Sequence, residues 1–141
     1  MTVDEFVEKT EGQFIDWDGK YGPQCVDLMR YYIHRVFGTE QPKGVDGAKD
    51  FFTLFEQTWD ETKWEKIVNE PTTLPKKGDI VIWGNGVYGH VAIFLGGDLR
   101  TFTSFDQNYP VIWAPPKSNG TPPTKVVHTY ANVLGFIRYK E

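Results

Sequence analysis

Several features that define whole classes of protein are scarce in this chain. It contains a single cysteine, so an internal disulfide is excluded. No apolar run reaches about 18 residues, which predicts that no segment spans a membrane. The formal net charge is -4 and no run of basic residues occurs, which argues against nucleic acid as a partner. The N-terminus carries acidic residues and no apolar stretch, so we expect no signal peptide.

The composition is that of a globular domain with a core rich in aromatic rings. Apolar residues make up 40% of the 141 positions and aromatic residues 16%. This length is enough for one compact domain with a real core, and no internal repeat or low-complexity tract divides it. We therefore expect a single domain over residues 1–141 that acts as a monomer. The proline-containing segment 114–124 is interpreted as a loop within it.

The order of the periodic segments predicts the fold class. Helix patterns come first, over residues 2–12, 26–37 and 46–57, and the pair Thr2 and Glu5 has the spacing of a capping box. Short strand patterns follow, at 79–83, 91–95, 99–105, 125–130 and 134–139. Helices followed by strands indicate an α+β fold, with N-terminal helices packed on a C-terminal antiparallel β-sheet.

The single cysteine, Cys25, lies where a loop pattern meets a helix pattern. Residues 16–24 are rich in glycine and polar residues, and the second helix pattern begins directly after Cys25. Unpaired N–H groups and the dipole at a helix N-terminus favour the thiolate, which is the nucleophilic form of cysteine. Position alone fits equally well with a small buried apolar residue, which is how many free cysteines behave.

A nucleophilic cysteine needs a base, and the chain offers three histidines. His34 follows Cys25 by nine residues on the same predicted helix, so it points to the opposite side. His128 lies in an ordinary strand pattern and is the less favoured candidate. His90 lies where a glycine-rich loop meets an apolar strand, and glycines leave room there for a ligand. His90 is therefore the expected base.

The base in turn needs an orienting group, which a hairpin can supply. If residues 96–98 form the turn, counting back places His90 opposite residues 104–106. Asp106 and Asn108 would share a face if the strand reaches that far, and either side chain can accept a proton from the imidazole. The alternative is that residues 106–108 only end the strand, because Asp and Asn favour turns. Together with the cysteine and the histidine, the orienting role is favoured.

Four segments, in this order along the chain, resemble the CHAP domain (cysteine, histidine-dependent amidohydrolase/peptidase). They are Tyr-Gly-Pro-Gln-Cys-Val-Asp at 21–27, Gly-Asp-Ile-Val-Ile-Trp at 78–83, Gly-His-Val-Ala-Ile at 89–93 and Phe-Asp-Gln-Asn at 105–108. The chain is most similar to the catalytic modules of bacteriophage endolysins. The resemblance implies a papain-like fold, peptidoglycan as the substrate, and a phage-encoded protein made in the host cytoplasm that acts on the cell wall.

The resemblance also implies roles for individual residues. The nucleophile of the family corresponds to Cys25 and its general base to His90. Its acidic orienting position, often Glu, is Asp106 here, and its following Asn is Asn108, so which of the two holds the imidazole stays open. Gln24, directly before the nucleophile, could donate its amide to an oxyanion, with the backbone N–H of Cys25 as the second donor.

The loop before the cysteine has the spacing of a cation site. Asp16, Asp18 and Asp27 occupy positions 1, 3 and 12 of a twelve-residue loop, as in an EF-hand, and Lys20 and Gly22 at positions 5 and 7 could add backbone carbonyls. The glycine at position 4 and the final Asp depart from a true EF-hand. Because some CHAP endolysin domains resemble this loop and bind calcium there, we expect calcium as a structural or activating ion. The alternative is a solvated turn rich in Asp.

Three functional hypotheses remain from the sequence. The leading one is a cysteine-dependent peptidoglycan amidase or endopeptidase. A related enzyme group, the NlpC/P60 cysteine peptidases, shares the order of cysteine and histidine, but the Gln-Cys-Val-Asp and Asp-Gln-Asn segments favour CHAP. A hypothesis from a different class is a catalytically silent module that binds the wall or calcium.

Overall fold

The computed structural model describes residues 1–20, 22–109, 113–114, 117–118 and 121–141. The helices of these residues, in chain order, are α1 (Val3–Thr10), α2 (Cys25–Tyr32), the π-helical turn η1 (Ile33–Phe37), α3 (Asp50–Thr53) and α4 (Phe55–Thr58). The strands are β1 (Trp64–Val68), β2 (Ile80–Trp83), β3 (His90–Gly97), β4 (Thr101–Asp106), β5 (Trp113–Ala114), β6 (Lys117–Ser118), β7 (Thr124–Thr129) and β8 (Val133–Tyr139). None of the helices in this described part is long and apolar enough to cross a membrane.

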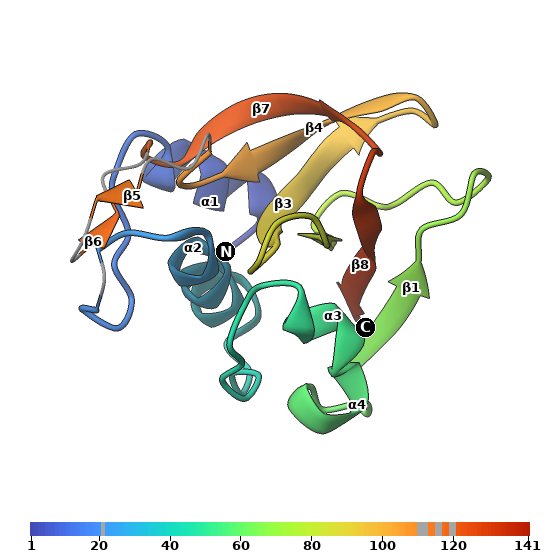
Figure 1. Ribbon diagram of the computed structural model, residues 1–141, viewed down its shortest axis with the longest axis horizontal. Helices are drawn as coiled ribbons and strands as arrows, with labels where there is room; N and C mark the ends of the chain where they lie inside the picture. The colour runs from blue at the N-terminus through green and yellow to red at the C-terminus, as the bar shows by residue number, and fades with distance from the viewer. Residues whose placement is uncertain (21, 110–112, 115–116, 119–120) are drawn as a thin grey trace.

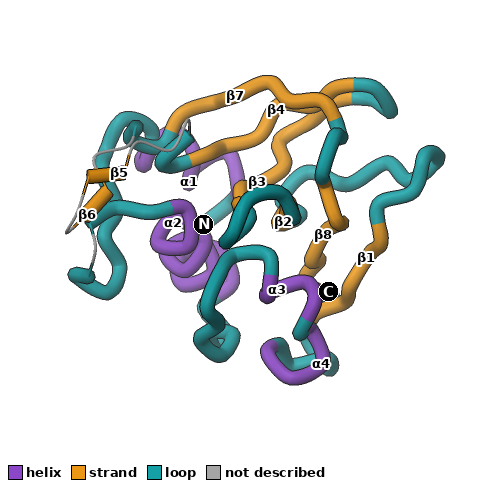
Figure 2. Tube along the Cα trace, in the orientation of Figure 1, coloured by secondary structure: helices purple, strands orange, loops and turns teal. Residues whose placement is uncertain are grey.

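Six of the strands form one antiparallel sheet, in the order β1-β8-β2-β3-β4-β7. The helices precede most of the sheet along the chain, and α2 lies beside β3 (Figure 1). β5 and β6 pair separately, away from the main sheet and next to the loop that leads into α2 (Figure 2). Helices packed on an antiparallel sheet make this an α+β fold, as the sequence predicts.

The sheet carries a hydrophobic cluster on each face. The larger cluster joins the helices to one face, through residues such as Phe6, Leu28, Tyr32, Ile80, Ile93 and Phe105. The smaller one covers the other face and consists of Val81, Trp83, Ala92, Phe94, Phe102, Val133 and Phe136. Because side chains alternate along a strand, β2 is buried over its whole length. The central strands are therefore fixed from both sides.

Two helix ends are defined by local signals that the sequence displays. The capping box of α1 is present: Thr2 Oγ1 accepts the Glu5 N–H, and Glu5 Oε1 accepts the Thr2 N–H, both at 3.1 Å. Helix α2 begins at Cys25, and its continuation η1 ends at Gly38, whose φ of 60° is left-handed. The hydroxyl of Tyr32 on α2 donates to the Gly78 carbonyl at 2.7 Å, which ties the helix to the start of β2.

Parts of the fold differ from the sequence prediction. The expected helix at 46–57 is two short helices, because the chain breaks at Leu54 (φ -111°, ψ 34°). Strand β1 was not predicted; it is an edge strand paired only with β8, and of its residues only Trp64 is fully buried. Part of the expected loop at 114–124 lies outside the described residues, and the described part contains the pair β5 and β6.

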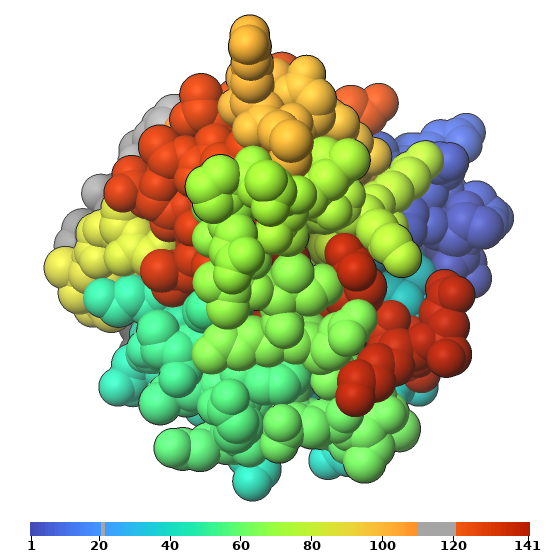
Figure 3. All heavy atoms as spheres, turned by 90° about the vertical axis from the view of Figure 1, so that its right-hand side faces the viewer, coloured from blue at the N-terminus to red at the C-terminus, as the bar shows by residue number. Residues whose placement is uncertain are grey.

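One face of the molecule contains the segment that connects β1 to β2 (Figure 3). Figure 3 shows this face, where the segment between β1 and β2 lies across the surface between the β3–β4 turn and the C-terminal residues.

Candidate active site

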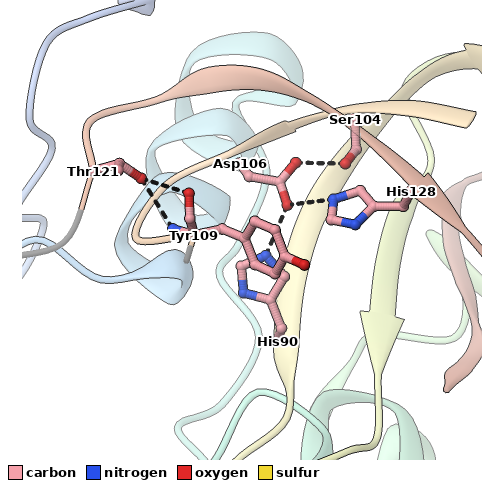
Figure 4. Close-up of polar contacts among 6 residues, drawn as sticks. All are labelled: His90, Ser104, Asp106, Tyr109, Thr121 and His128. Carbon is pink, nitrogen blue, oxygen red and sulfur yellow. Dashed lines mark hydrogen bonds and ion pairs between the residues drawn. The ribbon is translucent and has the colours of Figure 1, made fainter. Parts of the chain in front are cut away.

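The central residues of the candidate site each stand at the end of an element. Cys25 is the first residue of α2, His90 the first of β3 and Asp106 the last of β4. Figure 4 shows the imidazole of His90 pointing at the carboxylate of Asp106, with His90 Nε2 2.8 Å from Asp106 Oδ2. His90 is 7% exposed and Asp106 is fully buried, whereas Cys25 is partly exposed. The pair is thus shielded from water while the thiol remains accessible.

The carboxylate of Asp106 is held by three side chains. Its Oδ2 lies near both His90 Nε2 and His128 Nε2, and its Oδ1 accepts a short hydrogen bond from the Ser104 hydroxyl (Figure 4). Burial raises the pKa of Asp106, but the hydrogen bonds from His128, His90 and Ser104 and the charge of His90 lower it below its ordinary value. Asp106 is therefore ionised at neutral pH despite its burial.

The ionised carboxylate determines the protonation of His90. A carboxylate only accepts hydrogen bonds, so Nε2 of His90 must carry a proton. No described residue forms a hydrogen bond to the other nitrogen, Nδ1, which is also buried. Burial lowers the pKa of His90, but the hydrogen bond to Asp106 and the adjacent Cys25 thiol raise it to about 9. Nδ1 is thus the nitrogen that can exchange a proton with Cys25.

The register of the β3–β4 hairpin differs from the prediction. The turn is at residues 98–100 rather than 96–98, because Asp98 Oδ1 accepts the N–H groups of Arg100 and Thr101. A bulge between Phe94 and Gly96 shifts the pairing further, so that Ile93 faces Phe105. His90 therefore does not lie opposite residues 104–106. It reaches Asp106 diagonally across the two strands.

Asp106 and Asn108 do not share a face of β4, because the strand ends before Asn108. β4 stops at Asp106, and Asn108 has a left-handed φ of 60°. The backbone N–H of Asn108 donates to the Thr121 carbonyl at 2.8 Å. The carboxylate of Asp106 is thus the group placed against His90, while the backbone of Asn108 turns the chain away from the sheet.

His128 also contacts the site, although the sequence made it a less favoured candidate than His90 for the base. Its Nε2 lies 3.0 Å from Asp106 Oδ2, and its side chain is 7% exposed. His128 is on β7, where it pairs with Phe102 of β4, and Asp106 lies four residues after Phe102 on the same strand. Because side chains alternate along a strand, His128 and Asp106 project from the same face of the sheet. His34, in contrast, is exposed, as expected for the far side of the helix, and its ring lies 5.4 Å from that of Trp17 at a tilted angle of 55°.

Two aromatic residues enclose the histidines. The ring of Trp83 lies 5.0 Å from that of His90 and 4.7 Å from that of His128. The ring of Tyr109 lies 5.3 Å and 4.9 Å from the same two rings (Figure 4). Because Trp83 is buried and Tyr109 is partly exposed, Tyr109 forms the solvent side of the enclosure.

Gln107 connects the loop before the cysteine to the sheet. Its side-chain amide accepts the Ile15 N–H at 2.8 Å and donates to the carbonyls of Ile15 at 2.8 Å and Gln24 at 2.7 Å. The Gln24 N–H donates to Asp27 Oδ2 at 2.9 Å. The backbone next to Cys25 is therefore fixed both from the residue that follows β4 and from α2. The sequence pattern contains Gln107 but did not reveal this role, because its partners lie more than 80 residues away.

The three aspartates of the predicted cation loop lie together. Asp16, Asp18 and Asp27 each place a carboxylate oxygen within 4.8 Å of the others, the first two exposed and the third buried. Burial raises the pKa of Asp27 to about 6, aided by the charges of Asp18 and Asp16 and opposed by backbone hydrogen bonds. Three carboxylates at such distances suit a hard cation, which binds oxygen ligands. Lys20 and Gly22 belong to the same described loop, and their carbonyls remain predicted ligands.

Comparison with known proteins gives consistent results. A family model described as the CHAP domain matches residues 14–108, more than half of the chain. The chain is 35% identical over 135 residues to endolysin LysK of Staphylococcus phage K and 30% identical over 147 residues to endolysin PlyTW of Staphylococcus phage Twort. These matches cover 90% and 96% of the chain but 24% and 29% of the two endolysins, so the chain spans less than a third of these curated relatives.

A solved structure of an endolysin has a similar fold. The crystal structure of the wild-type endolysin LysIME-EF1 matches with a TM-score of 0.69 and 28% sequence identity. The match covers 96% of this chain and 62% of that one. The fold expected from the sequence, with helices packed on an antiparallel sheet, is thus shared with an endolysin.

Proposed function

The chain belongs to the CHAP domain family, and from this premise we propose that it is a peptidoglycan hydrolase with a cysteine nucleophile. One observation carries the proposal. Nε2 of His90 donates a hydrogen bond to the fully buried carboxylate of Asp106, and Nδ1, which has no hydrogen-bond partner among the described residues, can exchange a proton with the adjacent thiol of Cys25. This is the arrangement that a cysteine amidohydrolase needs, with a nucleophile, a base and an orienting group.

In the first half-reaction, the thiolate of Cys25 attacks the carbonyl carbon of an amide bond. The carbon–sulfur bond forms and the carbonyl oxygen becomes an oxyanion. The protonated Nδ1 of His90 gives its proton to the amide nitrogen as the carbon–nitrogen bond breaks, and an amine leaves. The thioester that remains holds the acyl part of the substrate.

In the second half-reaction, Nδ1 of His90 takes a proton from water, and the hydroxide attacks the thioester. The carbon–sulfur bond breaks, which releases a carboxylic acid and restores the thiolate beside a protonated His90; the released acid then loses its proton to solvent. We propose the side-chain amide of Gln24 and the backbone N–H of Cys25 as donors to the oxyanion in both steps. Fixing the backbone of Gln24 through Gln107 and Asp27 supports this role, since preorganised donors need no rearrangement.

We further propose that Asp16, Asp18 and Asp27, with the carbonyls of Lys20 and Gly22, hold calcium. The close carboxylates support the proposal, since a cation would offset their mutual repulsion. A bound cation would neutralise the loop and restrict it, and the loop leads directly to the nucleophile. All chemical steps above are performed by protein side chains and water.

The likeness to phage endolysins supports a phage-encoded lytic enzyme that reaches the wall from the host cytoplasm. We also propose that the chain acts as a monomer and, given its net charge of -4 and the lack of a basic run, without nucleic acid. The bond cut is an amide, either between muramic acid and alanine or within the peptides.

Purified bacterial cell walls test the proposed function. We expect the domain to lower the turbidity of the walls, and a thiol-blocking reagent to stop this by alkylating Cys25. Full lytic activity after complete alkylation would contradict a cysteine mechanism. Wall binding without turnover would instead identify a non-catalytic binding module.

A further inference from the structure

His128 is a second histidine on the carboxylate that orients His90. Both imidazoles place Nε2 against the same oxygen, Oδ2 of Asp106, at 2.8 Å for His90 and 3.0 Å for His128 (Figure 4). The proposed reaction uses His90 but assigns no role to His128. Burying a polar side chain costs free energy of folding unless the side chain is hydrogen-bonded, so a buried histidine beside the base needs an explanation.

The geometry of the carboxylate fixes the proton of His128 as well as that of His90. An ionised Asp106 can only accept, so Nε2 of His128 carries a proton and donates it. Ser104 donates to the other oxygen, Oδ1. With donors on both oxygens, the carboxylate cannot rotate about its χ2 angle without losing a hydrogen bond from β4 or β7. One Asp oxygen therefore stays aimed at His90.

The ring of His128 is itself held in place by packing. It lies between Trp83, Phe102 and Tyr109, with ring distances of 4.7, 5.5 and 4.9 Å. The titratable groups at this site come from several elements. They are His90 on β3, Asp106 on β4, His128 on β7, Cys25 on α2 and Tyr109 after β4. The buried carboxylate of Asp106 is the group that both imidazoles contact.

We propose that His128 is a positioning residue, which holds the Asp106 carboxylate in the orientation that directs Nδ1 of His90 at the nucleophile. The proposal deepens the proposed function and rests on it for the role of His90. His128 acts through Asp106 and does not touch the reacting atoms. A role in packing alone would require only its ring, whereas a positioning role requires its N–H.

Two substitutions separate the ring from the N–H. His128→Phe keeps an aromatic ring among the same three neighbours and removes the donor. His128→Gln removes the ring and keeps an N–H near the position of Nε2. Losing a hydrogen bond to a charged group corresponds to about a tenfold to hundredfold change in rate, so we expect a loss of that size in kcat/KM on cell walls for His128→Phe. We expect His128→Gln to restore most of it.

A double-mutant cycle tests whether the effect passes through Asp106. In an Asp106→Asn background, His128→Phe should cost little further activity, because the shared partner is already altered. Val127→Thr is the matched control, since Val127 is the neighbouring residue on β7 and 71% exposed. Equal activity of His128→Phe and His128→Gln, whether high or low, would overturn the proposal, and so would additive losses in the cycle.

Proton NMR gives a readout that does not depend on turnover. The Nε2 proton of His90, held by a buried carboxylate, should resonate far downfield in the wild type and in His128→Gln, and should be lost in His128→Phe. If His128→Phe does not fold, His128→Gln decides alone: loss of the signal in that folded variant overturns the proposal. If the wild type cleaves no wall, the proposed function fails, while the NMR signals still test the positioning role.

Discussion

The protonation of His90 reflects a balance between burial and two neighbours. Burial alone would make the imidazole neutral, but Asp106 and Cys25 raise its pKa to about 9. A pKa above the usual value of 6.5 means that the protonated form persists from acid pH up to about 9 and is lost above it. His90 is therefore protonated at neutral pH, as the proposed donation of a proton to the leaving amine requires.

This balance predicts the alkaline limb of the pH profile. Because kcat/KM reports the pKa values of the free enzyme, we expect it to fall as the pH rises through about 9. Asp106→Asn removes the negative charge that favours the imidazolium, so the alkaline limb should move to lower pH. The measurement is kcat/KM on cell walls between neutral and alkaline pH for both proteins. An unchanged limb in a folded Asp106→Asn variant would contradict the assigned role of Asp106.

At the scale of single residues, the sequence predicted three side chains that the structure brings together. Cys25, His90 and Asp106 could be proposed from sequence because a nucleophile needs a base and the base needs an acceptor. His128 could not, because its contact with Asp106 spans 22 residues and depends on how β4 pairs with β7. The bulge in β3 was equally hidden, since no residue type in that strand requires it.

At the scale of elements, Gly89 determines how β3 begins. Its φ is +75°, and a Cβ atom there would lie 2.4 Å from the Trp83 carbonyl oxygen and 2.7 Å from the Lys49 side chain. His90 is the next residue, so the close approach at Gly89 sets where the imidazole starts. The glycine-rich loop was predicted from sequence to give this freedom, and at Gly89 the backbone uses it.

Gly89→Ala should therefore destabilise the domain and disturb the site. A left-handed non-glycine residue costs on the order of 1–3 kcal/mol, and the clash with Trp83 adds to this. Gly96→Ala is the matched control on the same strand, because a Cβ there meets nothing within 4 Å. Chemical denaturation of both variants measures the difference. Equal stability of the two would show that the approach to Trp83 is not restrictive.

The link made by Gln107 predicts a second effect at this scale. Gln107→Leu removes the partners of partly buried backbone groups at Ile15 and Gln24, at a cost of about 1 kcal/mol for each group, near the lower end of the range for unsatisfied groups. We expect lower stability and a lower kcat, because the backbone before Cys25 loses its anchor. Gln57→Leu, the same change at an exposed position, is the control for both measurements. A Gln107→Leu variant with the stability and kcat of the control would contradict the linking role.

The strands were easier to predict than the helices and the edges. Strands β2, β3, β4, β7 and β8 carry β-branched or alternating apolar residues, and all five were expected near their observed bounds. β1 follows a short helical region and precedes two prolines, and its pairing with the C-terminal strand is a long-range contact. The third helix pattern was broken at Leu54 because tertiary packing of Phe51, Phe52 and Phe55 overrides local propensity.

At the scale of the whole molecule, calcium should couple the stability of the domain to its activity. An ion that binds only the folded state stabilises it by roughly 2.7 kcal/mol at a hundred times the dissociation constant. We expect calcium to raise the melting temperature, and a chelator to lower both the melting temperature and lysis. Magnesium should substitute poorly, because it requires near-octahedral geometry and dehydrates reluctantly.

The matched variants for this experiment are Asp18→Ala and Asp46→Ala. Asp18 belongs to the acidic cluster, whereas Asp46 is an exposed aspartate outside it. The first should abolish the calcium response and the second should preserve it. No heat of calcium binding to the wild type at millimolar ion, measured by titration calorimetry, would refute the site. Binding without any change in lysis would leave the ion with a structural role only.

The central claim is that Cys25, activated by His90, cleaves an amide bond of peptidoglycan. Mass spectrometry of the fragments released from purified walls tests it most directly, with wild type compared against a folded Cys25→Ala variant. We predict wild-type fragments that each end in a new amine or carboxylate, with a gain of one water per cut, and no such fragments from Cys25→Ala. The same fragments from Cys25→Ala at a rate near that of the wild type would contradict it.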